Sequence, residues 1–339
     1  MSKAKSRAPR PPAPARALEP WLAGNRPARL FVLAAITVLA LLPFAGKAYH
    51  IDDPLFVWAG KRIATQPLDP YGFQVNWYGY TLPMSDVTKN PPLTSYAIAA
   101  AAAVAGFGER PLHLAFLLPA IVVILMTYLL AEKLCGRPLL AALVTLTTPV
   151  FLLSSTTVMS DTMMLAWWMA ATYLWVTGLE TRTPWRLALA GLCIALSALS
   201  KYFGMTLIPL LILYTVLKQR RLDATLAYLV LPVLLLAAYQ WETHRVYGRG
   251  LLLDAASYAT GAPTQWGKMS PGKILIGLAF TGGCIGVAGV WALWPFRLKP
   301  LIAAAAVAVA VTLGVGATHA IGSYVLGPHD GVLGLTATF

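Results

Sequence analysis

The sequence has few charged residues and very few acidic ones. Only 12% of its 339 residues are charged, and 13 of them are Asp or Glu. Soluble globular domains carry about 25% charged residues, so this composition, together with a mean hydropathy of +0.66, excludes an ordinary soluble domain. The three cysteines are far apart and supply neither a disulfide framework nor a CxxC metal site. We expect packing roles for Cys135, Cys193 and Cys284.

Long apolar runs recur along the chain and are continuous rather than alternating. Lipid cannot satisfy backbone hydrogen bonds, so spanning segments are helices or closed barrels, and continuous runs favour helices. The net charge of +13 lies mostly in the N-terminal tail and in short connectors, which is typical of membrane proteins and not of a nucleic-acid partner. We therefore predict an all-α polytopic membrane protein with about nine transmembrane helices. The predicted spans are 30–44, 111–131, 138–154, 162–179, 187–200, 203–217, 224–240, 274–294 and 300–320.

The short apolar run 91–106 decides the predicted topology. If it crossed the membrane, the basic connectors that follow would lie on the side opposite the basic tail, against the positive-inside rule. Its 16 residues rise about 24 Å, less than the hydrocarbon core of about 30 Å. We therefore predict that it re-enters or lies at the interface, with the N-terminus cytoplasmic and the C-terminus outside. The predicted organisation is a disordered basic tail 1–28, a membrane module 29–240 with outer loop 47–110 and its juxtamembrane helices, a second outer loop 241–273, and a two-span segment with a short outer tail 274–339.

This topology places several charged residues on the outer side, among them the adjacent carboxylates of "HIDDP". Asp53 followed by Pro54 is typical of an N-cap with proline at the first helical position. No capping role is predicted for Asp52. A carboxylate at a membrane edge can accept a proton from a nucleophile or bind a cation.

The other candidates also have a structural reading and a functional one. "KNPPL" predicts a helix start at Asn90 and Pro91, with Lys89 either extending to the interface or binding an anion. Asp161 opens a later span as a cap or as a site residue, and Lys201 binds a phosphate or pairs with an aspartate. Arg245 is a candidate for bidentate phosphate binding. Glu242 and His244 are too few to define a metal site, so a divalent cation is left open.

The stretch "LDPYGFQVNWYGYTLPM", residues 68–84, is rich in aromatic residues and turn signals. Such aromatic side chains either form an interfacial belt or make a wall on which a sugar or lipid stacks. The sequence leaves both readings open. The residues concerned are Tyr71, Phe73, Trp77, Tyr78 and Tyr80.

An acidic pair after the first span, then "NPPL", an Asp opening a later span and a Ser-Lys after the fifth resemble the GT-C type integral-membrane glycosyltransferases. The pattern is most similar to the group of dolichyl-phosphate-mannose protein mannosyltransferases and lipid A aminoarabinose transferases, over residues 30–220. The "DD" and "NPPL" pieces are the most specific. Relatives often have Lys or His directly before Pro-Pro, whereas here Asn90 holds that position and Lys89 precedes it.

The resemblance implies an inverting transfer of a sugar from a polyprenyl phosphate to an acceptor hydroxyl at the outer face, in a bacterial inner membrane. Asp52 would be the general base and Asp53 its support. Lys89, Lys201 or Arg245 would stabilise the phosphate, and Asp161 would bind the acceptor or a metal. The acceptor could be a lipid, a glycan or a protein. The alternatives are a polytopic transporter, for which charges in mid-span would be expected, and a non-catalytic membrane assembly factor.

Overall fold

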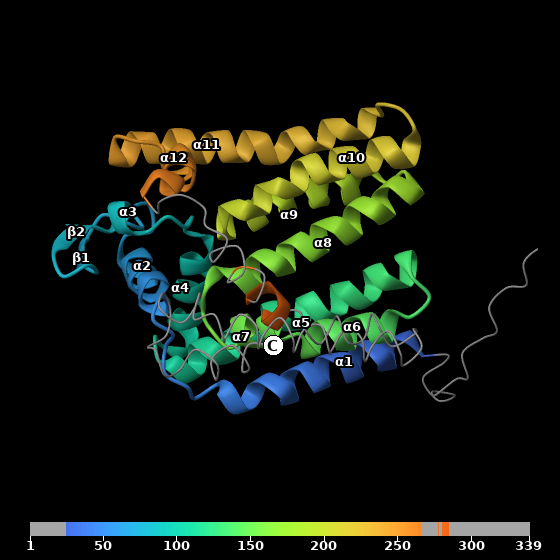
Figure 1. The fold of residues 1–339 in the computed structure, drawn as a ribbon, viewed down its shortest axis with the longest axis horizontal. Coiled ribbons are helices and arrows are strands. Elements are labelled where there is room, and N and C mark those ends of the chain that lie inside the picture. The colour runs from blue at the N-terminus through green and yellow to red at the C-terminus, as the bar shows by residue number, and fades with distance from the viewer. Residues whose placement is uncertain (1–24, 266–276, 278–279, 285–339) are drawn as a thin grey trace, which may run out of the picture.

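The computed structural model describes residues 25–265, 277 and 280–284. Helices dominate this part of the chain, and one small hairpin accompanies them (Figure 1). The last two predicted spans, the segment 274–339 and most of the tail 1–28 fall outside the described residues. The α-helices are α1 (Arg26–Leu41), α2 (Asp53–Thr65), α3 (Met84–Val87), α4 (Leu93–Ala105), α5 (Glu109–Leu134), α6 (Pro138–Thr147), α7 (Pro149–Ser155), α8 (Ser160–Thr181), α9 (Pro184–Ser200), α10 (Leu207–Gln219), α11 (Val230–Tyr247) and α12 (Leu251–Gln265). Three short 3-10 helices are η1 (Leu42–Phe44), η2 (Tyr202–Thr206) and η3 (Ala224–Leu229), and the strands are β1 (Gln74–Asn76) and β2 (Thr81–Pro83).

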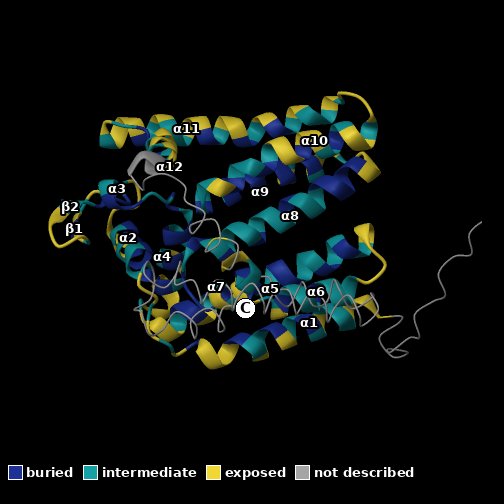
Figure 2. Cartoon of the chain, in the orientation of Figure 1, coloured by how far each residue is buried: buried dark blue, intermediate teal, exposed yellow. Residues whose placement is uncertain are grey.

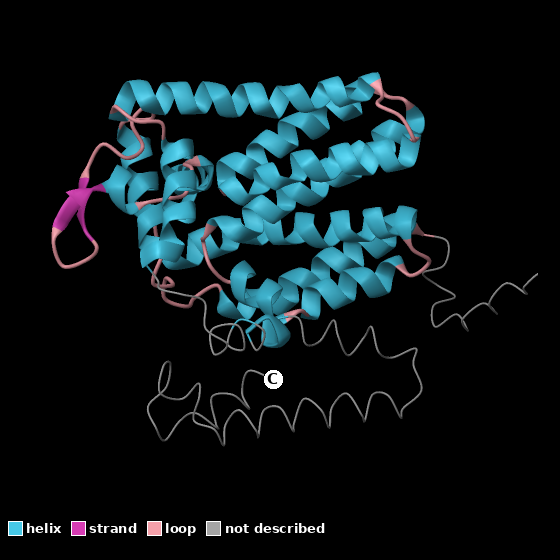
Figure 3. Ribbon diagram, turned by 45° about the horizontal axis from the view of Figure 1, so that its top comes forward, coloured by secondary structure: helices cyan, strands magenta, loops and turns pink. Residues whose placement is uncertain are grey.

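The long helices α1, α5, α8, α9, α10 and α11 run alongside one another and form a bundle with two distinct ends (Figure 1). The connectors α5–α6, α8–α9 and α10–α11 lie at one end. Helices α2, α3, α4 and α12 and the hairpin lie at the other end, and the hairpin projects from it (Figure 3). The connectors α5–α6, α8–α9 and α10–α11 are rich in basic residues. The predicted site segments lie at the other end.

Length and composition identify four helices that can cross a membrane among the described residues, or five if the pair α6 and α7 forms one broken span bent by 65°. The four are Arg26–Phe44, Glu109–Leu134, Tyr202–Gln219 and Ala224–Tyr247. The predicted total of nine is therefore not shown. Helix α1 already begins at Arg26, so the end of the predicted tail is helical, and α11 continues to Tyr247, beyond the predicted end of its span at residue 240.

Helix α4 does not run with the bundle but packs near α2 at the hairpin end (Figure 1). Its 13 residues rise about 20 Å, too short for the hydrocarbon core of about 30 Å. The predicted helix start at Asn90 and Pro91 is wrong, because the helix begins at Leu93 with Pro92 at the N-cap position. A residue before proline is disfavoured in the α region, so Pro91 before Pro92 delays the start.

Burial follows the position of each helix in the bundle. Helices α1 and α11 lie on its flanks and show much exposed or partly exposed surface, whereas the buried residues gather between them (Figure 2). The flanking surface is apolar, with Phe31, Leu39 and Leu234 all more than half exposed, as lipid contact requires. Of the three cysteines, Cys193 is buried as expected for packing, whereas Cys135 is exposed.

The antiparallel hairpin pairs Gln74 with Pro83 and Asn76 with Thr81. It stands between α2 and α3, and Val75 points into a buried cluster with Tyr71, Met84 and Leu251. That cluster joins the segment around the hairpin to the start of α12. The hairpin is thus fixed to the body of the protein at its base.

Candidate functional site

Asp53 is a buried connector between two distant segments. Its side chain is fully buried, and its carboxylate accepts the backbone N–H of His50 at 2.7 Å and that of Val158 at 3.2 Å. Helix α2 begins at Asp53, so the predicted N-cap role for this residue is wrong. The carboxylate accepts hydrogen bonds from the turn before α2 and from the turn before α8. It does not accept them from the first N–H groups of its own helix. Burial raises the pKa of Asp53, although both N–H groups and the nearby His113 and His50 act in the opposite direction.

The neighbouring Tyr49 links the same turn to the start of α5. Its hydroxyl donates to the Phe107 carbonyl at 2.7 Å, and its backbone N–H donates to Glu109 at 3.3 Å. Burial and the two carboxylates Glu109 and Asp53 raise the pKa of Tyr49 to about 12. The hydroxyl is therefore protonated at neutral pH and keeps its role as a donor.

Asp52 occupies the N-cap position of α2, but its side chain makes no capping hydrogen bond. The residue is partly exposed, and no described residue forms a hydrogen bond or ion pair with its carboxylate. The backbone on either side is held, because the buried Asp53 follows it and its own N–H donates to Nδ1 of His50 at 3.5 Å. Among the described residues, the Asp52 carboxylate is thus unpaired, whereas the adjacent Asp53 carboxylate accepts two backbone hydrogen bonds.

Asp161 and Lys201 form an ion pair of 2.6 Å close to this point. Asp161 lies in the first turn of α8, three residues after the Val158 whose N–H is held by Asp53. Lys201 is the residue that ends α9. Of the alternatives left open for Lys201, pairing with an aspartate is the one observed. About a third of each side chain is exposed, so the pair is screened and its contribution to stability is modest.

Lys89 belongs to a second charged group that joins the segment between α3 and α4 to α12. Its ammonium lies 2.6 Å from Asp254, and Arg249 lies 3.9 Å from the other oxygen of the same carboxylate. Arg249 also pairs with Asp86 and donates to the Ser85 carbonyl at 3.0 Å. Two cations therefore converge on one carboxylate of α12.

The two charged groups are connected through aromatic residues. Tyr202 directly follows Lys201, and its hydroxyl lies 3.0 Å from that of Tyr239. Tyr239 packs against the buried cluster that contains Tyr71 and Leu251. The Tyr71 hydroxyl donates to the Asn90 carbonyl at 2.9 Å, next to Lys89. Segments separated by more than 100 residues in the sequence thus meet at the hairpin end of the bundle.

The structure does not join Arg245 to these groups. Its guanidinium forms a pair with Glu242 on the exposed surface of α11, at 2.6 Å, and lies over the Trp241 ring. The side chain of Asn90 likewise caps no helix, and its backbone carries the contacts of this residue. In the described part of the chain, no three His, Cys, Asp or Glu side chains gather as metal ligands.

Sequence reasoning missed Asp86 and Asp254, which hold the cations of the second group. Arg249 was visible in "YGRG", but nothing local indicated its partners. The only sequence signal was the rarity of acidic residues, since each Asp outside the basic connectors is a candidate for a specific partner. Asp86 follows the hairpin and Asp254 lies on α12.

The fold and site define a class: an integral membrane protein of α-helices whose isolated carboxylate and cations gather at one end of the bundle. Residues 89–241, a little under half of the chain, match the family model described as dolichyl-phosphate-mannose-protein mannosyltransferase. This segment is similar to that family of GT-C membrane glycosyltransferases, whose members transfer a sugar from a lipid-phosphate donor. No curated protein and no solved structure gives a significant match. The matched segment contains Lys89, Asn90, Asp161 and Lys201 but neither Asp52 nor Arg245.

Proposed function

We propose that the protein transfers a sugar from a polyprenyl-phosphate donor to an acceptor hydroxyl with inversion, and that Asp52 is the general base. The observation that carries this assignment is the contrast between the two adjacent carboxylates. The Asp53 carboxylate accepts hydrogen bonds from two backbone N–H groups, whereas Asp52 is partly exposed and unpaired among the described residues. A general base must be able to reach a substrate proton, and Asp52 can do so without breaking a structural contact.

The chemistry needs one proton acceptor and one place for the leaving phosphate. Asp52 would take the proton of the acceptor hydroxyl as its oxygen attacks the anomeric carbon from the side opposite the phosphate. The bond from the anomeric carbon to the phosphate oxygen breaks, and the lipid phosphate leaves with the electron pair. Fixed cations stabilise this developing charge, and Lys89 and Lys201 lie on the two sides of the connected site.

The site would face the outside of a bacterial inner membrane. Support comes from the separation of charge between the two ends of the bundle. The connectors with Lys133, Arg182 and Arg221 lie at the end opposite the site (Figure 1), and basic connectors favour the cytoplasmic side. A lipid-linked donor and an acceptor at the outer surface would then meet at the hairpin end.

Membranes that contain the protein are expected to transfer radiolabel from a polyprenyl-phosphate sugar to an endogenous acceptor. The reason is that the donor arrives from the bilayer and needs no nucleotide site. The measurement is label in the non-donor fraction of membrane vesicles, compared with vesicles from cells without the protein. Equal label in both preparations, tested with mannose, glucose and aminoarabinose donors, would contradict the proposed activity.

Lys89 is expected to contribute to donor binding in competition with Asp254. The phosphate would replace the carboxylate that now lies 2.6 Å from the Lys89 ammonium. Loss of a charged hydrogen bond is worth about 1.5–3 kcal/mol, so Lys89→Ala should raise the KM for the donor by about tenfold or more, and Asp254→Asn should lower it. Steady-state kinetics with varied donor measures both effects.

The matched control for this pair is Arg182→Ala at the opposite end of the bundle. Arg182 also pairs with an aspartate, Asp223, at 2.9 Å. Its loss should leave the KM for the donor unchanged. If Lys89→Ala and Arg182→Ala changed the KM alike, Lys89 would have no part in donor binding.

A further inference from the structure

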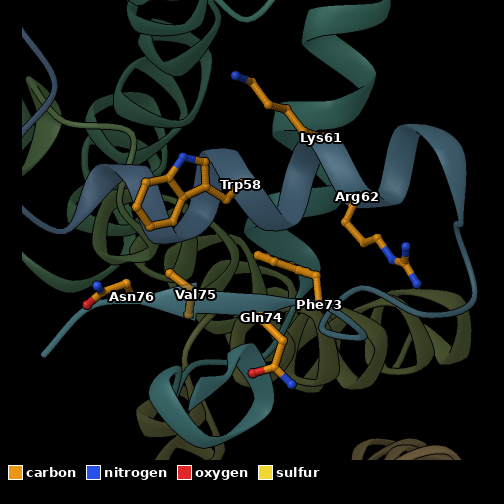
Figure 4. A pocket seen from close by; sticks show the side chains of 7 residues that line it. All are labelled: Trp58, Lys61, Arg62, Phe73, Gln74, Val75 and Asn76. Carbon is orange, nitrogen blue, oxygen red and sulfur yellow. The ribbon is translucent and has the colours of Figure 1, made fainter. Parts of the chain in front are cut away.

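A groove of about 520 Å³ lies between helix α2 and strand β1, apart from the residues assigned to sugar transfer (Figure 4). Helix α2 supplies one wall and the strand supplies the other. None of the residues proposed for donor binding or catalysis lines it. The lining residues are Trp58, Lys61, Arg62, Phe73, Gln74, Val75 and Asn76.

The walls combine aromatic rings with side-chain amides. The Trp58 indole lies over the strand near Val75 and Asn76, and Phe73 lies at the other end of the strand (Figure 4). Trp58 is held edge-on by Trp77, with ring centroids 6.2 Å apart and an interplanar angle of 84°. Gln74 and Asn76 are exposed on the strand, and an amide both donates and accepts hydrogen bonds.

Of the two cations at the groove, one is paired and the other points away from the strand. The Arg62 guanidinium donates to the Asp69 carboxylate at 2.7 Å and to its backbone carbonyl at 3.3 Å. The Lys61 ammonium points away from the strand (Figure 4) and lies 5.8 Å from the Phe107 ring centroid. The groove therefore suits a neutral occupant.

The strand wall is fixed before any ligand arrives. Asp69 accepts a second hydrogen bond from the Tyr247 hydroxyl at 3.0 Å, and the same hydroxyl accepts the backbone N–H of Tyr71 at 3.1 Å. A Cβ atom at Gly72 would overlap the Asp69 carboxylate, so this close approach requires glycine. Side chains held in place in this way lose little entropy when a ligand binds.

We propose that this groove binds a neutral carbohydrate and that the acceptor of the transfer is therefore a glycan. A sugar ring offers C–H groups to an aromatic face and hydroxyl groups to amides, which matches this mixture of apolar walls and a few polar groups. The proposal rests on the proposed function for the identity of the acceptor. It names the class of acceptor, which the family match leaves open.

The groove and the proposed base both belong to helix α2 and its N-cap. Trp58 follows Asp52 by six residues on the same helix, so it lies about 9 Å farther along the axis and about a third of a turn around it. One sugar ring cannot occupy both positions. The acceptor would therefore be an oligosaccharide, with one unit in the groove and a more distant unit presenting its hydroxyl to Asp52.

The experiment measures sugar binding without any donor. The full chain in lipid nanodiscs is titrated with neutral oligosaccharides, one to four units long, of glucose, galactose, mannose or N-acetylglucosamine. Saturation-transfer NMR reports binding. At least one of them should bind the wild type, and Trp58→Ala should weaken this binding by about tenfold or more, as should Asn76→Ala. Asn76 is exposed, so its variant is the one that does not depend on repacking.

The matched control lies at the tip of the same hairpin. Tyr78 and Tyr80 are 58% and 60% exposed and belong to no wall of the groove, so Tyr78→Ala should bind the sugar as the wild type does. Absence of binding to the wild type, or equal binding by wild type and both groove variants, would overturn the proposal. Because no donor is present, this failure is distinct from failure of the transfer assay.

Discussion

The Asp52→Asn variant is expected to lose transfer activity by about 10²–10⁴-fold, the usual contribution of a general base. Asparagine keeps the size of the side chain but cannot take a proton. Because the Asp52 carboxylate makes no hydrogen bond or ion pair with the described residues, its loss should leave the fold unchanged. Radiolabel transfer at saturating donor and acceptor measures the effect on kcat, and thermal unfolding in detergent checks the fold.

Two controls sharpen this test. Asp223→Asn removes a carboxylate at the opposite end of the bundle, where it pairs with Arg182, and should leave transfer unaffected. Asp52→Glu retains a base but displaces it, so it should recover only part of the activity. Equal transfer by wild type and Asp52→Asn would show that the base is another residue.

The Asp53→Ala variant is expected to lose stability rather than chemistry. The buried carboxylate satisfies the N–H groups of His50 and Val158, and a buried donor left without a partner costs about 1–3 kcal/mol. The two together predict a loss of roughly 2–6 kcal/mol in the free energy of unfolding. Thermal or denaturant unfolding of the purified protein measures it. Asp53→Asn, which keeps one acceptor oxygen, should lose less.

The pH dependence of this contribution has a defined sign. Burial raises the pKa of Asp53 above its ordinary value of 3.8, so the folded protein binds this proton more tightly than the unfolded chain. The stability linked to the proton is present below pH 3.8 and is lost as the pH rises through the folded pKa. Wild type should therefore gain stability over Asp53→Asn on acidification. An unfolding temperature of Asp53→Ala equal to that of wild type would remove the structural role assigned here.

The sequence was sufficient for features that depend on local pattern. The continuous apolar runs predicted helices, and the run before Gly106 forms a helix of 13 residues, as short as its sequence indicated. Its re-entrant or interfacial position stays a prediction. The clustering of Asp161 and Lys201 also followed, because both residues were placed at span ends on one side of the membrane. Their pairing was one of the alternatives that the sequence left open.

The sequence could not supply features that depend on contacts between distant segments. The role of Asp53 is set by Val158, which lies 105 residues later, so a capping pattern at residues 53 and 54 was misleading. The partners of Lys89 and Arg249 depend on how the start of α12 and the residues before it pack against the segment that contains Asp86 and Lys89. Arg245 shows the reverse, because a plausible phosphate ligand in the sequence is paired with Glu242 on its own helix.

The charged group that joins Lys89 to Asp254 also sets an order of events during synthesis. Its two halves lie 165 residues apart in the chain, with the helices of the bundle between them. At a translation rate of about 5–20 residues per second, the second half emerges roughly 10–30 s after the first. The loop that carries Asp86 and Lys89 is therefore made before its partners Arg249 and Asp254, and it lacks these contacts until both have emerged. A chaperone or the insertion machinery would meet this loop in an open form that the finished protein no longer shows.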